Sequence, residues 1–203
     1  MKSAKLCSVA AAFAAAFLVF SCASTGGSGG GGFAGGWNFD DPAKGTDRWG
    51  LARSEFYQYT GDIAISQDSE TFGDGKLRID LDFSAPENQK DWCEPKLVID
   101  LPRSINIGGF GSLAYDFYFD PSARNQGNFQ TKIFTNTSAP IDANGGIPSS
   151  GEELENGFTH VEVVIPFKPT KGFITDLRLS IVGSGTDYVG PVFIDNIRFL
   201  PIE

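Results

Sequence analysis

Hydrophobic and polar residues alternate along much of the chain. Apolar side chains occupy every second position in several stretches, and charged or polar side chains fill the positions between them. A period of two is typical of strands that bury one face, and no long stretch shows the period of a helix. The stretches that predict strands are Lys76–Phe83, Trp92–Leu101, Leu113–Asp120, Val161–Phe167, Leu177–Ile181 and Val192–Phe199.

Turn residues separate these predicted strands. Gly-, Pro- and Asn-rich segments follow one another at intervals that suit short antiparallel strands, as at 72–75, 144–146 and 183–185. Many short strands together with 18 phenylalanines predict an all-β sandwich, and a jelly roll in particular. The stretch 139–157 is rich in Gly, Ser, Asn and Glu, and we expect a long surface loop there.

The first residues have a different pattern. Lys2 and Lys5 precede an uncharged apolar run over 8–20, which is shorter than the roughly 20 residues of a membrane-spanning helix. A basic start followed by a short apolar core is typical of a secretory signal. The residues Val19–Cys22 then resemble a bacterial lipobox, which predicts a signal peptide over 1–21 and acylation of Cys22. The alternative is an ordinary signal peptide in which this cysteine has no role.

A glycine-rich segment follows the predicted acylation site. Residues 22–36 are almost entirely Gly, Ser and Thr after the cysteine, and such a chain behaves as a flexible coil spanning roughly 20 Å. We therefore expect Cys22 to hold a single folded domain, residues 37–203, on a membrane through a lipid anchor and a linker. This arrangement predicts a location in the bacterial cell envelope, either periplasmic or exposed at the surface.

Charge and the rare residues exclude several functions. The formal net charge is -9, which argues against nucleic acid and against anionic lipid surfaces as partners. Removal of the predicted signal and acylation of Cys22 leave Cys93 alone, so no disulfide framework is expected. His160 is the only histidine, and we expect it to be structural. Nothing in the sequence suggests an obligate interface, and we expect a monomer.

The predicted strand Trp92–Leu101 carries chemistry on one face. With a period of two, its apolar residues face the core, while Trp92, Glu94 and Lys96 face outwards. An indole offers a rigid surface for the C–H faces of a sugar, and an acid with a base supplies acceptors and donors for hydroxyl groups. These three residues are therefore candidates for carbohydrate binding. In the alternative interpretation, the tryptophan covers a sheet edge and the two charges form a solvated pair.

A second candidate site involves aspartates near both ends of the domain. Asp195 has the same phase as Phe193 and Ile197, and a carboxylate on the core face must be paired or bind a metal. Asp40 and Asp41, with carbonyl groups of the 73–75 turn, would complete a shell made only of oxygen ligands, which suits Ca²⁺. Alternatively, Asp195 bonds backbone amides or an arginine, or the core lies on the other face of this strand.

Several segments along the domain match a known pattern. They are Trp37–Asp40, Trp49–Gly50, Gly73–Leu77, Asp91–Lys96 and Leu177–Phe199, the last of which contains Gly-Pro-Val-Phe-Ile-Asp-Asn. Together these segments resemble carbohydrate-binding module family 27, whose members occur in β-mannanases and bind mannans. It implies a jelly roll of the galactose-binding-domain type, stabilised by a structural calcium ion.

The resemblance also implies roles for particular residues. Trp49 and Trp92 match two sugar-stacking positions in a shallow cleft, and Asp40 and Asp195 match calcium ligands. A third tryptophan of the family has no counterpart here, and Phe134 is the aromatic residue nearest to its place.

These observations predict a protein that is not an enzyme and that binds polysaccharide of the β-mannan type, including glucomannan and galactomannan. A sandwich glycosidase is one alternative: such an enzyme needs two carboxylates about 5–10 Å apart on the cleft face, and Asp80 or Asp82 would have to lie near Glu94 to form the pair. The Glu-x-Asp-x-Glu run of laminarinase-type enzymes is absent from the sequence. A structural or protein-binding lipoprotein is the other alternative, and burial of Trp49 and Trp92 would favour it.

Overall fold

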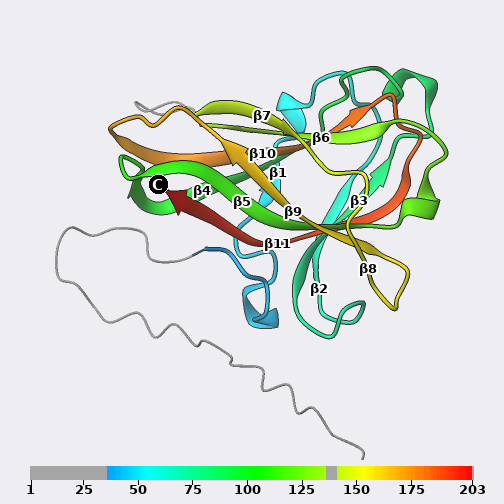
Figure 1. Cartoon of the computed structure of the whole chain (residues 1–203), viewed down its shortest axis with the longest axis horizontal. Helices are drawn as coiled ribbons and strands as arrows, with labels where there is room; N and C mark the ends of the chain where they lie inside the picture. The colour runs from blue at the N-terminus through cyan, green and yellow to red at the C-terminus, as the bar shows by residue number, and fades with distance from the viewer. Residues whose placement is uncertain (1–35, 136–140, 203) are drawn as a thin grey trace, which may run out of the picture. The chain divides into compact units, whose positions relative to one another are not determined.

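The computed structural model describes residues 36–135 and 141–202, which form a sandwich of two antiparallel sheets (Figure 1). The first sheet contains, in spatial order, β1 (Gly50–Leu51), β4 (Lys96–Asn106), β10 (Phe173–Ser184), β6 (Asn128–Phe134) and β7 (Asp142–Gly146). The second contains β2 (Ala64–Asp68), β3 (Lys76–Asp82), β11 (Val189–Pro201), β5 (Phe110–Phe119), β9 (Thr159–Pro166) and β8 (Glu152–Glu153). The all-β sandwich predicted from the sequence is confirmed.

Four short 3-10 turns precede or connect strands in the described part of the chain. They are η1 (Pro42–Lys44), η2 (Arg53–Glu55), η3 (Pro86–Asn88) and η4 (Pro121–Ala123). Within the described part of the chain, no helix is long and apolar enough to cross a membrane. The predicted signal peptide, the acylated Cys22 and nearly all of the glycine-rich linker lie outside the described residues.

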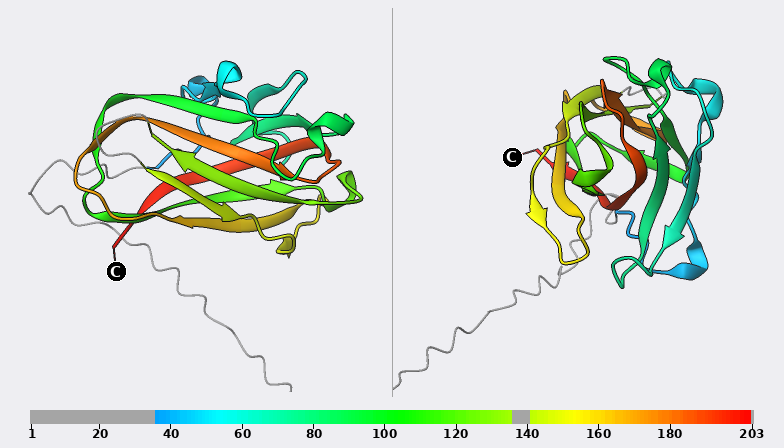
Figure 2. Two further views of the ribbon diagram at one scale, coloured as in Figure 1. Left: turned by 90° about the horizontal axis from the view of Figure 1, so that it is seen from above. Right: turned by 90° about the vertical axis from the view of Figure 1, so that its right-hand side faces the viewer.

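The alternating pattern builds the core between the two sheets. Leu77, Ile79 and Leu81 of β3 face Leu97 and Ile99 of β4 from the opposite layer, and all five are buried. The strands run along the long axis of the domain in both layers (Figure 2). Each predicted strand overlaps an observed one, because burying one row of side chains fixes which face of each strand is inside. The strand predicted over Trp92–Leu101 begins later, at Lys96.

The predicted long loop over 139–157 is only partly correct. β7 and β8 lie within that range and pair with β6 and β9 respectively. Their sequences, Asp-Ala-Asn-Gly-Gly and Glu-Glu, have no apolar alternation because both strands lie at sheet edges. The hydrophobic pattern therefore could not reveal them.

A β-bulge in β11 decides which way Asp195 points. Val192 and Ile194 face the core, and Asn196 then adopts a left-handed conformation with φ of 51°. Pairing with β5 shifts between Asp195 and Arg198, after which Ile197 and Phe199 face the core instead. A single extra residue changes the phase of a strand. Asp195 consequently lies on the outer face of the six-stranded sheet. For this half of the strand, the core is therefore on the other face from the one first expected from the sequence.

Candidate functional site

The outer face of the five-stranded sheet carries a compact group of polar and aromatic side chains, which we call the candidate face. Strand register places Lys96, Ser180 and Lys132 opposite one another across β4, β10 and β6. The next row lies towards the C-terminal end of β4 and includes Arg178 of β10 and Phe134 of β6. Residues that share a face and a row of a sheet lie within contact distance of their neighbours.

Glu94 lies at the centre of a hydrogen-bond network on the candidate face. Its Oε2 accepts a hydrogen bond of 2.9 Å from the indole Nε1 of Trp92, and its Oε1 accepts one of 2.8 Å from Ser180 Oγ. Lys96 Nζ lies 3.3 Å from the same Oε1 and also donates to the backbone carbonyl of Glu55 at 2.7 Å. Glu94 is only 5% exposed, so the network fixes the orientation of the half-buried Trp92.

The sequence therefore placed Trp92, Glu94 and Lys96 on the correct face, but it did not predict their burial. Lys96 is buried like Glu94, so the two form an internal ion pair and not a solvated one. A segment over 52–57 covers the edge of the sheet beside them, where the Ala52 amide bonds the Lys96 carbonyl. In this arrangement Glu94, paired with Lys96, holds the Trp92 indole through a hydrogen bond.

A second polar group lies one row away. Arg178 bonds both carboxylate oxygens of Glu55, with Nε 2.8 Å from Oε2, and it also pairs with Asp176. The ring of Phe134 lies beneath three cations, with its centroid 4.8 Å from Lys96 Nζ, 5.6 Å from the Arg178 guanidinium and 5.5 Å from Lys132 Nζ. Cation–π contacts of this length hold the cationic side chains over the ring.

Tyr57 is a member of the candidate face that the sequence pattern did not reveal. Its backbone forms an antiparallel bridge with Glu94, with hydrogen bonds of 3.1 and 2.8 Å in the two directions. Directly paired residues project to the same side, so Tyr57 lies beside Glu94 on the face that carries Trp92. Its side chain is 52% exposed. An isolated bridge has no period, and only the pairing shows that this tyrosine belongs to the face.

Trp49 does not belong to the candidate face, so its assignment as a sugar-stacking residue is wrong. It is 2% exposed and packs edge-to-face against Trp37, with ring centroids 5.6 Å apart. The bridge between Trp37 and Ile197 anchors the N-terminal segment to β11, and Trp49 follows the turn that leads into β1. The two tryptophans thus form part of the core where the domain begins.

The structure does not bring Glu94 together with Asp80 or Asp82, the carboxylates of the glycosidase alternative. β3, which carries both aspartates, belongs to the other sheet. Asp80 pairs with Arg78, and Asp82 accepts a hydrogen bond from the Ser84 amide. The buried Glu94 carboxylate is engaged by three donors. This arrangement does not form a pair of carboxylates across a cleft.

The surroundings of Asp195 do not fit the calcium site that the sequence suggested. Lys76 Nζ lies 3.4 Å from Asp195 Oδ2 and is almost fully buried. Asp40 is exposed and accepts a hydrogen bond from the Asn38 side chain at 2.9 Å. In residues 36–135 and 141–202, no three His, Cys, Asp or Glu side chains group as metal ligands would. A donor set that contains an ammonium group disfavours a divalent cation.

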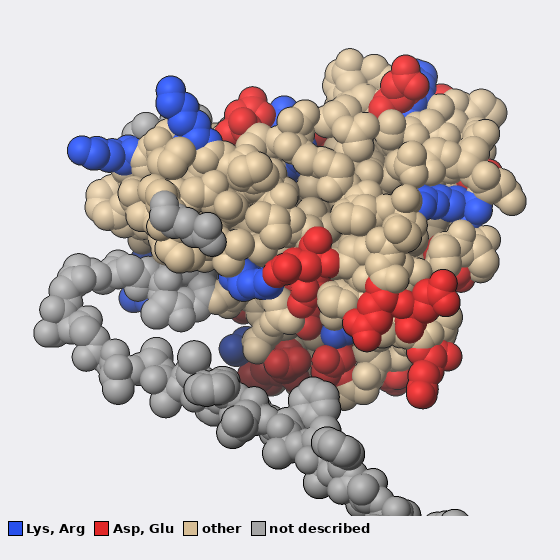
Figure 3. Space-filling model, in the orientation of Figure 1, with Lys and Arg blue, Asp and Glu red and all other residues tan. Residues whose placement is uncertain are grey.

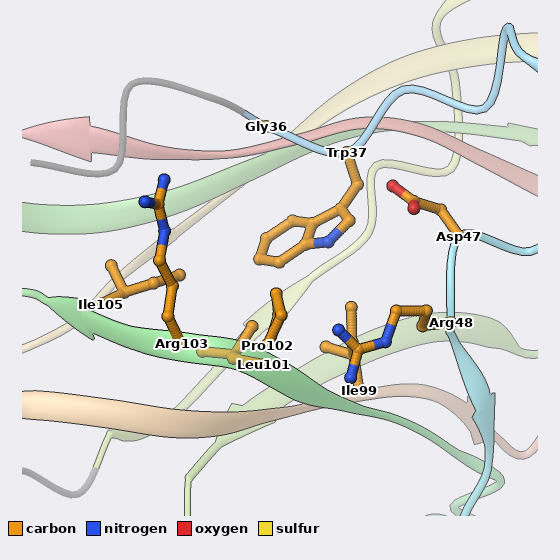
Figure 4. A pocket seen from close by; sticks show the side chains of 9 residues that line it. All are labelled: Gly36, Trp37, Asp47, Arg48, Ile99, Leu101, Pro102, Arg103 and Ile105. Atoms are coloured by element: carbon orange, nitrogen blue, oxygen red, sulfur yellow. The ribbon is translucent and has the colours of Figure 1, made fainter. Parts of the chain in front are cut away.

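Two other surface features lie away from the candidate face. A hollow of about 220 Å³ lies where the N-terminal segment meets β4, between Trp37, Arg48 and Arg103 (Figure 4). The two arginines approach it from different segments, and its floor is apolar. Acidic side chains gather around the positions of β2 and β8 (Figure 3). Neither feature combines exposed aromatic rings with fixed hydrogen-bonding groups as the candidate face does.

Cys93 has no reactive role in this site. The thiol is buried and lies 3.2 Å from the carbonyl oxygen of Gln58. Burial raises its pKa to about 12, so the thiolate is not populated at neutral pH.

Three solved structures with the same fold are carbohydrate-binding modules. The mannan-recognising module TmCBM27 aligns over 84% of this chain and 97% of its own, with a TM-score of 0.62 and 22% identity. The module CBM27-1 of Caldicellulosiruptor saccharolyticus, solved with mannohexaose, aligns over 77% of this chain and 91% of its own, with a TM-score of 0.59 and 19% identity.

A family 28 module, described as specific for non-crystalline cellulose, aligns over 76% of this chain and 89% of its own, with a TM-score of 0.58 and 18% identity. No protein-family model and no curated protein sequence matches the chain. At identities of 18 to 22%, these similarities establish the fold, a β-sandwich that the modules of both families share.

Proposed function

We propose that this protein binds polysaccharide without cleaving it, and that its ligand is a β-mannan, glucomannan or galactomannan chain. The observation that carries this proposal is the grouping of Trp92 and Tyr57 around the buried Glu94. The fold is shared with one module that recognises mannan and with another that was solved with mannohexaose, which supports the same ligand class. Family 28 shares the fold too, so cellulose is the competing neutral glycan.

The chemistry of the candidate face suits a neutral sugar chain. Trp92 lies two residues before Glu94 and Tyr57 pairs with Glu94, so the two aromatic side chains lie on the same side of this bridge. Aromatic rings with few rotatable bonds offer contact area at a low entropic cost. Lys132 and Asp142, which pair at 3.3 Å, and the exposed Asn144 add hydrogen-bonding groups on neighbouring strands.

The fixed orientation of the face supports binding and not catalysis. A general acid must be able to exchange a proton with its substrate, whereas both oxygens of Glu94 are occupied by protein donors. Affinity from two or three rings is modest, because association costs several kcal/mol before any net binding appears. We further propose that acylated Cys22 holds many copies in the bacterial cell envelope, where avidity for a long polysaccharide compensates for weak single sites.

Affinity electrophoresis of the chain from Ala23 onward tests this proposal. Gels containing galactomannan, glucomannan, xylan or a soluble cellulose derivative are compared with a gel without polysaccharide. We expect retardation by the mannans, and its loss in Trp92→Ala and Tyr57→Ala.

Phe173→Ala provides a matched control, because Phe173 is 53% exposed and lies at the end of β10 that is distant from Ser180 and the candidate face. We expect this variant to migrate like the wild type in every gel. Retardation by the cellulose derivative alone would show that cellulose, and not mannan, is the ligand. No retardation of a folded protein by any polysaccharide would refute carbohydrate binding and favour a structural or protein-binding role.

A further inference from the structure

A buried lysine lies on the outer face of the six-stranded sheet. Lys76 begins β3, and Leu77 beside it faces the core, so Lys76 points away from the core. It is nevertheless only 3% exposed. The rings of Phe72 and Tyr118 lie 5.2 and 4.6 Å from Nζ, within the range of a cation–π contact. Aromatic side chains thus shield this ammonium group from water.

Two carboxylates neutralise this ammonium group. Nζ lies 2.9 Å from Asp74 Oδ1 and 3.4 Å from Asp195 Oδ2. Asp195 is buried, and its other oxygen accepts a hydrogen bond of 2.7 Å from the Asn196 amide. Both oxygens of Asp195 are therefore satisfied by groups of this chain, as a buried carboxylate requires.

Backbone geometry fixes the position of the lysine. Gly75 approaches the Phe39 carbonyl so closely that a Cβ atom at Gly75 would lie 1.8 Å from its oxygen. Gln67 donates a hydrogen bond to the same carbonyl at 3.0 Å. The turn that carries Asp74 is thereby held against the N-terminal segment, and Lys76 is directed towards Asp195.

The pKa of Lys76 agrees with this environment. Burial disfavours the charged amine, but the hydrogen bond to Asp74 and the negative charges around it outweigh that effect and raise the pKa above its ordinary value. Burial raises the pKa of Asp195 as well, although the Asn196 amide and Lys76 act against this change. The ammonium group therefore stays charged throughout the neutral range.

We propose that Lys76 supplies the positive charge that a structural calcium ion supplies in the site expected from the sequence, so that this domain is stabilised by an internal cation. A divalent ion bound to Asp195 would lie close to the ammonium group, and the two cations would repel each other strongly in a buried position. One site consequently holds one cation or the other. The proposal concerns stability and is independent of polysaccharide binding.

Thermal unfolding of the wild-type chain from Ala23 onward, in excess CaCl₂ and in EDTA, gives the first test. A bound ion at a hundredfold excess over its Kd would raise Tm by about 5–10 °C. We expect the same Tm in both solutions, and no heat of binding when CaCl₂ is titrated into the protein in a calorimeter. A calcium-dependent rise in Tm, or saturable heat, would overturn the proposal.

Lys76→Met gives the second test, because it removes the charge and keeps the length of the side chain. We expect Tm to fall by about 6–20 °C, since Asp195 is left buried without its partner. The exposed Lys168 provides the control, and Lys168→Met should leave Tm unchanged. The double variant Lys76→Met with Asp195→Asn should have a higher Tm than Lys76→Met, because it removes the unpaired carboxylate. If Lys76→Met does not fold, the double variant should still fold. A Lys76→Met protein as stable as Lys168→Met would refute the role of the lysine.

Discussion

Replacement of Glu94 by glutamine is expected to weaken both the fold and the candidate face. Its carboxylate accepts hydrogen bonds from Trp92 and Ser180 and neutralises Lys96. An amide has one acceptor oxygen, so one of its NH groups must face a donor. If the oxygen remains with Ser180 and Lys96, the amide group faces the indole N–H and releases Trp92.

The expected cost follows from burial. Loss of a hydrogen bond to a charged group costs about 1.5–3 kcal/mol, and leaving a buried ammonium without its partner costs about 3–5 kcal/mol. The two losses overlap, and Lys96 keeps its bond to the Glu55 carbonyl, so we expect about 3 kcal/mol in total. This corresponds to a decrease in Tm of about 6–12 °C.

Urea denaturation followed by tryptophan fluorescence measures this change. Glu87 is exposed in η3, and Glu87→Gln serves as the control with no expected change in the unfolding free energy. Adding Lys96→Met to Glu94→Gln should cost less than the sum of the two single changes, because the second change removes the unpaired charge. A Glu94→Gln protein within about 0.5 kcal/mol of the wild type would refute the assignment of Glu94 as the centre of the network.

Three further predictions test other assignments. Trp49→Phe should leave polysaccharide retardation unchanged, because Trp49 lies in the core; loss of retardation in a folded variant would return Trp49 to the binding surface. Cys93, the only cysteine after residue 22, should resist Ellman's reagent in the native protein and react in urea, because burial raises the pKa of its thiol to about 12. Hydrogen bonds from Ser84 lower the pKa of Asp82 below 3.8, so its stabilising contribution is present above that value and is lost as the pH falls through the folded-state pKa. Asp82→Asn should therefore have a lower free energy of unfolding than the wild type at pH 7, and the difference should disappear in measurements towards pH 2. A difference that stays constant with pH would contradict this prediction.

The strands of the core were predictable from the sequence because each obeys a single constraint. β3, β5, β9 and β10 bury one row of apolar side chains between the sheets, and such a row appears directly as a period of two. β7 and β8 lie at sheet edges, where no apolar row is required, and they were missed. Asp195 was misplaced for a related reason, because the bulge at Asn196 changes the phase within one strand and leaves no mark in the hydrophobic pattern.

The candidate face was predictable only where it follows a strand. Trp92 and Glu94 precede β4 and continue its period of two, so their common orientation with Lys96 could be inferred from spacing alone. Tyr57 joins them through one bridge to Glu94 and is 37 positions distant in the sequence. Trp49 was assigned from a resemblance, and a resemblance of sequence segments does not report whether an indole faces the core or the solvent.

The burial of Glu94 and Lys96 changes what selectivity the candidate face is able to have. If these charges lay at the surface, they would contact sugar hydroxyls directly and their exchange would alter ligand preference. Because they are enclosed, they act on the ligand only by holding Trp92 in place. Discrimination between mannan and cellulose must then depend on the groups that remain exposed, which are the rings of Trp92 and Tyr57 and the polar side chains of β6 and β7. Substitutions at Asn144 or Lys132 are therefore expected to change which polysaccharide is bound, whereas substitutions at Glu94 are expected to weaken binding to all of them alike.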